Sequence, residues 1–106
     1  MNNVQLIGYL GRDPQIRACA NGNMLAVLRL ATDTYFDRKG NPVKITQWHT
    51  VKLWGKEQIM KFCECLIKGS HVLVEGHLLY DSYMDKSGQT RHVTEIKANN
   101  LVDLDR

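Results

Sequence analysis

The stretch 47–56 reads QWHTVKLWGK and restricts the possible folds most, because its residues alternate between two chemistries. Successive side chains of a strand point to opposite faces, so every second residue shares a face. One face would carry two indoles with a hydroxyl and an ammonium group between them: Trp48, Thr50, Lys52 and Trp54. The other would be an ordinary core-facing row: His49, Val51 and Leu53. The stretch predicts a strand with one core-facing side and one aromatic and cationic side.

The aromatic and cationic side has two interpretations. Exposed indoles stack on nucleic-acid bases, and a lysine beside them pairs with phosphate. Alternatively, a small barrel buries both tryptophans, and Lys52 extends its stem past them so that its charge reaches water. This stretch alone leaves both interpretations open.

The rest of the chain predicts four further strands and one helix. Strand patterns, with the stretch above, cover 2–10, 24–34, 47–55, 70–83 and 90–97, and a last short strand or cover follows at 101–104. A helix over 56–67 is predicted by apolar residues at i, i+3, i+4 and i+7: Ile59, Phe62, Cys63 and Leu66. Bends are expected at three glycines: Gly8, Gly11 and Gly76. This order is typical of the oligonucleotide-binding barrel. We therefore predict an all-β fold, a five-stranded OB-fold barrel with one short helix between strands three and four.

The segment Tyr35–Pro42 is predicted to be a loop, because its Gly-Asn-Pro sequence is a turn signal. Two adjacent aromatics, Tyr35 and Phe36, precede two basic residues there, which suggests contact with a partner. The alternative is that one of these aromatics closes an end of the barrel.

The composition indicates one small globular domain. The chain has 106 residues, and residues 1–106 are expected to form a single domain. A formal net charge of +3 permits an anionic partner without proving one. No apolar run approaches the roughly 18 residues of a membrane helix, and the N-terminal sequence has no basic region or cleavage site of an export signal. We expect a cytoplasmic protein.

The three cysteines do not indicate a disulfide framework or a metal site. Cys19, Cys63 and Cys65 are few and unevenly spaced, which fits a reducing compartment. Zinc sites usually combine C-x2-C pairs with further Cys or His at matched spacing, whereas Cys63 and Cys65 would diverge by about 200° on a helix. We predict no metal and no cofactor, and interpret Cys63 as a core residue.

Four sequence blocks in fixed order resemble the bacterial single-stranded DNA-binding proteins. They are VQLIGYLGRDP at 4–14, LAT at 30–32, WHTVKLWGK at 48–56 and KGSHVLVEG at 68–76. The resemblance runs from about Asn3 to Ile96, and the joint occurrence of the blocks is specific where each alone is weak. It implies sequence-independent binding and protection of single-stranded DNA during replication, recombination and repair, at the nucleoid.

The resemblance also assigns roles to individual positions. Base-stacking aromatics of the family fall on Phe36, Trp48, Trp54 and Tyr83. Its phosphate-contacting positions fall on Arg17, Lys39, Lys56, Lys68 and Arg91. Lys52 is added from the alternation argument rather than from the family. The family further implies a homo-oligomer, a tetramer, and the candidate interface residues are Val4, Leu6, His49 and Leu73.

Two departures from the family pattern bear on function. The family usually carries several basic residues where this chain reads Leu79-Tyr80-Asp81-Ser82, which puts the affinity of that path in doubt. The chain also ends at Arg106 with neither a Gly- and Pro-rich linker nor an acidic tip, which puts recruitment of replication and repair enzymes in doubt. Short primosomal relatives lack a tail as well, so an accessory role is the alternative.

Two other classes of function compete with nucleic-acid binding. An enzyme is not expected, because the acidic residues and histidines form no nucleophile elbow, phosphate loop or metal spacing. A protein-interaction barrel that binds no nucleic acid is the better competitor, since this fold hosts many functions. Quenching of tryptophan fluorescence by an oligonucleotide separates this class from a nucleic-acid binder.

Overall fold

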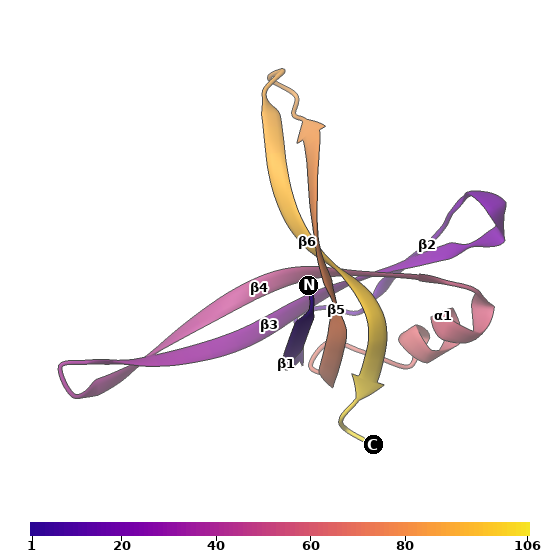
Figure 1. Ribbon diagram of the computed structural model, residues 1–106. Helices are drawn as coiled ribbons and strands as arrows, with labels where there is room; N and C mark the ends of the chain where they lie inside the picture. The colour runs from indigo at the N-terminus through magenta and orange to yellow at the C-terminus, as the bar shows by residue number, and fades with distance from the viewer.

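The computed structural model describes residues 1–106 and consists mostly of β-strands with one helix (Figure 1). The strands are β1 (Val4–Leu10), β2 (Gln15–Ala18), β3 (Met24–Arg38), β4 (Asn41–Gly55), β5 (His71–Met84) and β6 (Thr90–Asp103). A 3-10 turn, η1 (Ala20–Gly22), links β2 to β3, and the helix α1 (Glu57–Glu64) follows β4. No helix has the length and apolar character needed to cross a membrane.

Five of the strands close into a barrel. They are hydrogen-bonded in the order β1-β5-β6-β4-β3, and β3 pairs back to β1 at Tyr9 and Leu10. The short strand β2 pairs antiparallel along the edge of β3 as a hairpin, and the connection contains Asn21-Gly22, a common hairpin turn sequence. The helix α1 lies between β4 and β5. The strand numbers include the short β2, so β4 is the third of the five barrel strands along the chain, and the helix follows it. This closed barrel is the OB-fold architecture.

Two glycines allow the barrel to close. A Cβ at Gly8 would collide with the carbonyl oxygen of Ala31, and a Cβ at Gly76 would collide with that of Lys97. The β5–β6 register also shifts between Glu75 and Gly76. The backbones of neighbouring strands thus approach closely where the sheet bends, which only a residue without a side chain permits.

The core forms from inward-facing strand residues and one side of the helix. Its buried members are Leu10, Ala26, Leu28, Leu30, Val51, Leu53, Met60, Cys63, Leu66, Val72, Val74, Ile96 and Ala98. Val51 and Leu53 confirm the core-facing row predicted for the third long strand. Cys63 is fully buried, as predicted, and burial raises the pKa of its thiol to about 11.

The predicted loop at Tyr35–Pro42 is wrong. The strand β3 continues to Arg38 and β4 begins at Asn41, so only Lys39 and Gly40 form the turn. Both turn residues have positive φ angles, 53° and 82°, as a two-residue type I′ hairpin turn requires. Hydrophobic alternation located the buried halves of these strands only, because the outer halves are exposed on both faces. The helix is likewise shorter than the predicted 56–67.

The extended strands form two arms that project from the barrel in different directions (Figure 1). We call them the β3–β4 arm (residues 33–46) and the β5–β6 arm (residues 80–95). Neither contains a buried residue. The radius of gyration is 15.7 Å, above the roughly 13 Å of a compact domain of about a hundred residues. The arms therefore extend the reachable surface well beyond the barrel.

Candidate functional site

Both tryptophans lie on an outward face of the barrel. Trp48 is 50% exposed and Trp54 is 38% exposed, while Val51 and Leu53 between them are buried. This confirms the alternation and excludes burial of both indoles. We call this surface the tryptophan face; it comprises Arg29, Trp48, Thr50, Lys52, Trp54, Glu95 and Lys97, which the strand registers place side by side.

The indole of Trp48 has a defined seat. A Cβ at Gly11 would overlap the six-membered ring of Trp48, so the ring packs directly on the glycine backbone. The guanidinium carbon of Arg29 lies 5.7 Å from the ring centroid, and Arg29 Nη1 donates a hydrogen bond of 3.0 Å to Thr50 Oγ1. The orientation of the Trp48 indole is therefore fixed by the backbone of Gly11 on one side and by the guanidinium group of Arg29, from the neighbouring strand.

Trp54 has a similar cationic neighbour. Lys97 Nζ lies 5.5 Å from its ring centroid. A cation–π contact at an exposed site contributes about 0.5–1 kcal/mol, whereas stacking of a base on an aromatic ring contributes about 1–3 kcal/mol. A base can therefore displace either cation from its ring. The two tryptophans lie six residues apart, roughly 20 Å along an extended strand, and so form separate stacking sites.

The other two candidate aromatics lie on the arms. Tyr83 is exposed on the β5–β6 arm opposite Arg91, and alternation puts it on the same side of the sheet as Glu95. Phe36 lies on the β3–β4 arm opposite Val43, with Arg38 at 5.7 Å over its ring. Alternation places Phe36 on the opposite side of its hairpin from Trp48. The four aromatics are thus distributed along barrel and arms rather than gathered in one pocket.

The predicted phosphate-binding residues fall into two groups. Four are exposed and make no ion pair: Arg17, Lys39, Lys56 and Lys68. Two have a carboxylate partner. Lys52 Nζ lies 2.9 Å from Glu95 Oε2, and Arg91 Nε lies 2.8 Å from Asp85 Oδ2.

Sequence reasoning missed Arg29 and Lys97 as members of this site. Arg29 is a charged residue within an apolar strand, which was a signal, but its proximity to Trp48 depends on the β3–β4 register. Lys97 reaches Trp54 because β6 runs parallel to β4 with Lys97 opposite Lys52. Neither pairing can be read from local sequence.

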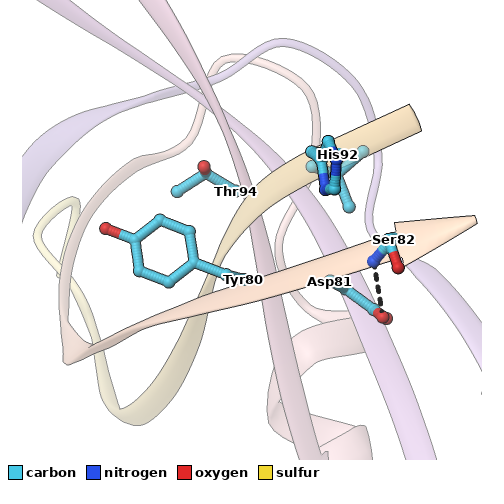
Figure 2. Close-up of a pocket in the computed structure, with 6 residues that line it drawn as sticks. Tyr80, Asp81, Ser82, His92 and Thr94 are labelled. Atoms are coloured by element: carbon cyan, nitrogen blue, oxygen red, sulfur yellow. Dashed lines mark hydrogen bonds between the residues drawn. The ribbon is translucent and has the colours of Figure 1, made fainter. Parts of the chain in front are cut away.

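A shallow hollow of about 430 Å³ lies on the β5–β6 arm. Figure 2 shows Tyr80 beside Thr94 there, with His92 and Ser82 further along the arm. The Asp81 carboxylate accepts a hydrogen bond from the Ser82 backbone N–H and makes no ion pair. The arm thus has an uncompensated acid where the sequence departs from the family pattern.

The candidate interface residues lie in three different environments. Val4 and Leu6 are partly buried and pack against the core. His49 Nε2 lies 2.8 Å from Thr32 Oγ1; partial burial, and then the nearby Arg29 charge, lower the pKa of this histidine. Leu73 lies on the outside of β5.

An apolar surface surrounds Leu73. The registers align Ile7 with Leu73 and Leu73 with Val102, and Tyr9 stacks on His71 at a centroid distance of 4.5 Å. Ile7 and Tyr9 are both more than half exposed. We call this surface, Ile7, Tyr9, His71, Leu73 and Val102, the apolar face. The outward row of β1 is therefore Ile7 and Tyr9 rather than Val4 and Leu6.

Comparisons with known proteins agree with this fold. The model of the single-strand binding protein family matches residues 1–104. A single-stranded DNA-binding protein of Xylella fastidiosa is 39% identical over 102 residues, which are 95% of this chain and 62% of that relative. The chain thus spans less than two thirds of the length of this curated relative.

Two solved structures are also similar. The single-strand binding protein of Plasmodium falciparum, in complex with single-stranded DNA, has a TM-score of 0.88 at 28% identity, over 98% of this chain and 95% of that one. A deletion mutant of the single-stranded DNA binding protein from Thermus aquaticus has a TM-score of 0.83 at 30% identity, over 98% of this chain and 50% of that one.

Proposed function

The chain belongs to the single-strand binding protein family, and on that premise we propose that it binds and protects single-stranded DNA without regard to sequence. The observation that carries the proposal is the pair of exposed tryptophans, Trp48 and Trp54, on one outward face of a closed barrel. Every base has a flat π-face, so stacking on indoles is tolerant of sequence. The protein would act in replication, recombination and repair at the nucleoid, by binding alone, with no catalysis and no cofactor.

In this proposal the single-stranded DNA follows the tryptophan face of the barrel and continues along the arms. Bases stack on Trp48 and Trp54, and further bases stack on Phe36 and Tyr83 where the strand passes the arms. Phosphates meet exposed cations distributed around this path: Arg17, Lys39, Lys56, Lys68 and Arg91. Lys52, the sixth predicted phosphate contact, is paired with Glu95 instead. Such a surface binds through stacking and counterion release together.

The proposal includes a homo-oligomer, a tetramer. An apolar face of the kind formed by Ile7, Tyr9 and Leu73 is unusual on a monomer and marks an interaction surface. The strand β1 pairs with β3 only at Tyr9 and Leu10, so most of that edge has free backbone donors and acceptors. A second copy of the same strand would satisfy both features through a self-complementary contact.

Tryptophan fluorescence tests the proposal directly. Addition of oligo-dT should quench the emission of Trp48 and Trp54, and a mixed-sequence single strand of equal length should quench it similarly. A duplex of the same length should quench it much less, because its bases are already stacked. If no single strand changes the emission or binds by an independent assay, the chain is a protein-interaction barrel instead.

A further inference from the structure

Three cations and one carboxylate lie among the indoles of the tryptophan face, and only one of these cations has a carboxylate partner. Lys52 Nζ lies 2.9 Å from Glu95 Oε2, and both side chains are largely shielded, 25% and 13% exposed. Arg29 and Lys97 each lie over an indole ring instead, and neither forms an ion pair. The three cations are therefore not equally available to a phosphate.

The strand register explains why Lys52 has a carboxylate partner and Lys97 has none. Because β4 and β6 run parallel with Lys52 opposite Lys97, two ammonium groups of like charge stand on neighbouring strands, an arrangement that costs stability. Glu95 lies two residues before Lys97 and so projects from the same side of β6. Its carboxylate attracts Lys52, and Lys97 is left to lie over Trp54.

We propose that Arg29 and Lys97 bind the phosphates beside the two stacked bases. Glu95, by pairing with Lys52, keeps Lys52 from binding phosphate and thereby limits the affinity of this face for single-stranded DNA. This inference rests on the proposed function. A base that stacks on an indole displaces the cation from that ring, and the long Arg29 or Lys97 side chain then turns to the adjoining phosphate. Lys52 would only exchange one anion for another, and the exchange would leave the shielded Glu95 carboxylate unpaired beside a phosphate.

The dependence of affinity on salt counts the cations that meet phosphate. For single strands the slope of log K against log salt is about −0.7 per neutralised phosphate. Removing one phosphate contact should therefore make the slope shallower by about 0.7. Across a fourfold increase in salt, the variant should then lose roughly threefold less affinity than the wild type loses. Removing a cation that meets no phosphate should leave the slope unchanged.

The experiment measures oligo-dT affinity at several salt concentrations for the wild type and five variants. Arg29→Gln and Lys97→Gln should each bind more weakly with a shallower slope. Glu95→Gln should bind more tightly with a slope steeper by about 0.7, because it releases Lys52. Lys52→Met with Glu95→Gln removes the ion pair at constant net charge and should keep the wild-type slope. Lys61→Gln on α1 is the matched control for a lost surface charge.

The outcomes separate the inference from the proposed function. A wild type that binds no oligo-dT ends the proposed function itself. If the wild type binds, a double variant whose slope is shallower by about 0.7 makes Lys52 a phosphate contact and overturns the inference. Slopes of Arg29→Gln and Lys97→Gln equal to that of Lys61→Gln overturn it as well. Circular dichroism of each variant confirms that the barrel is intact.

Discussion

Substitution of single side chains on the tryptophan face should weaken DNA binding without affecting folding. Trp48 and Trp54 are both exposed, and the core beneath them includes Val51 and Leu53. We expect Trp48→Ala and Trp54→Ala each to weaken binding of oligo-dT by about 1–3 kcal/mol, a range known from single-strand-binding OB-fold proteins of this very class. Fluorescence anisotropy of a labelled strand measures the loss. Thermal unfolding of both variants should stay close to that of the wild type, and a large loss of stability would place the indoles in the core.

His49 should give the stability a pH dependence in mildly acidic solution. Burial, with the charge of Arg29, lowers the pKa of His49 in the folded chain below its ordinary 6.5. Below pH 6.5 the unfolded chain binds a proton at this position that the folded chain does not bind, so the free energy of unfolding falls as the pH falls toward the folded pKa. Urea unfolding at several pH values measures this slope.

A matched pair of variants assigns that slope to one residue. His49→Gln keeps a hydrogen-bonding group near Thr32 and removes the titration, so the slope should flatten. His92→Gln, on the exposed β5–β6 arm, serves as the control and should retain the wild-type slope. Equal slopes in all three proteins would contradict a lowered pKa at His49.

At the scale of elements, the tip of the β5–β6 arm depends on one carboxylate. Asp85 Oδ1 accepts hydrogen bonds from Ser87 Oγ at 2.7 Å and from the backbone N–H of Gln89 at 3.0 Å, and Oδ2 accepts one from Arg91 Nε. The bond from the Ser87 hydroxyl and then the bond from Arg91 are the main causes that lower the pKa of Asp85 to about 2. The carboxylate is therefore charged throughout the physiological range.

We expect Asp85→Ala to loosen this tip without unfolding the barrel. Backbone amides of Ser87 and Gln89 should exchange with solvent faster, while barrel amides such as that of Val51 keep their protection. Since the pKa is lowered on folding, the contribution of Asp85 is fully present above its ordinary pKa of 3.8 and is lost as the pH falls through about 2. Wild-type amide exchange at the tip that is already fast at pH 5 would contradict this role.

The sequence predicted the barrel well and the arms poorly, for one physical reason. Alternation between a buried and an exposed face identifies a strand, and that contrast exists in the barrel at Val51 and Leu53. It disappears in the β3–β4 arm, where both faces are exposed, so a real hairpin with a Lys39-Gly40 turn was predicted as a loop. In β1 both rows are apolar, so alternation alone could not decide whether Leu6 or Ile7 faces outward.

The site was predictable to the same extent. Trp48 and Trp54 follow from local alternation and from motifs within ten residues. Arg29 and Lys97, which lie over the indoles, and Glu95, which pairs with Lys52, come from strands distant in the sequence. Their roles depend on a register that long-range pairing sets.

At the scale of the whole molecule, the apolar face should hold copies of the chain together. A self-complementary contact through β1 brings position 7 of two copies into one interface, so Ile7→Glu would place two desolvated like charges there at a cost of several kcal/mol. We expect light scattering at micromolar concentration to report a tetramer for the wild type and a smaller species for this variant. Ile67→Glu is the matched control, because Ile67 is 62% exposed, close to the 57% of Ile7, and lies outside the face. A monomeric wild type, or an Ile7→Glu protein with the wild-type mass, would show that this face is not the contact.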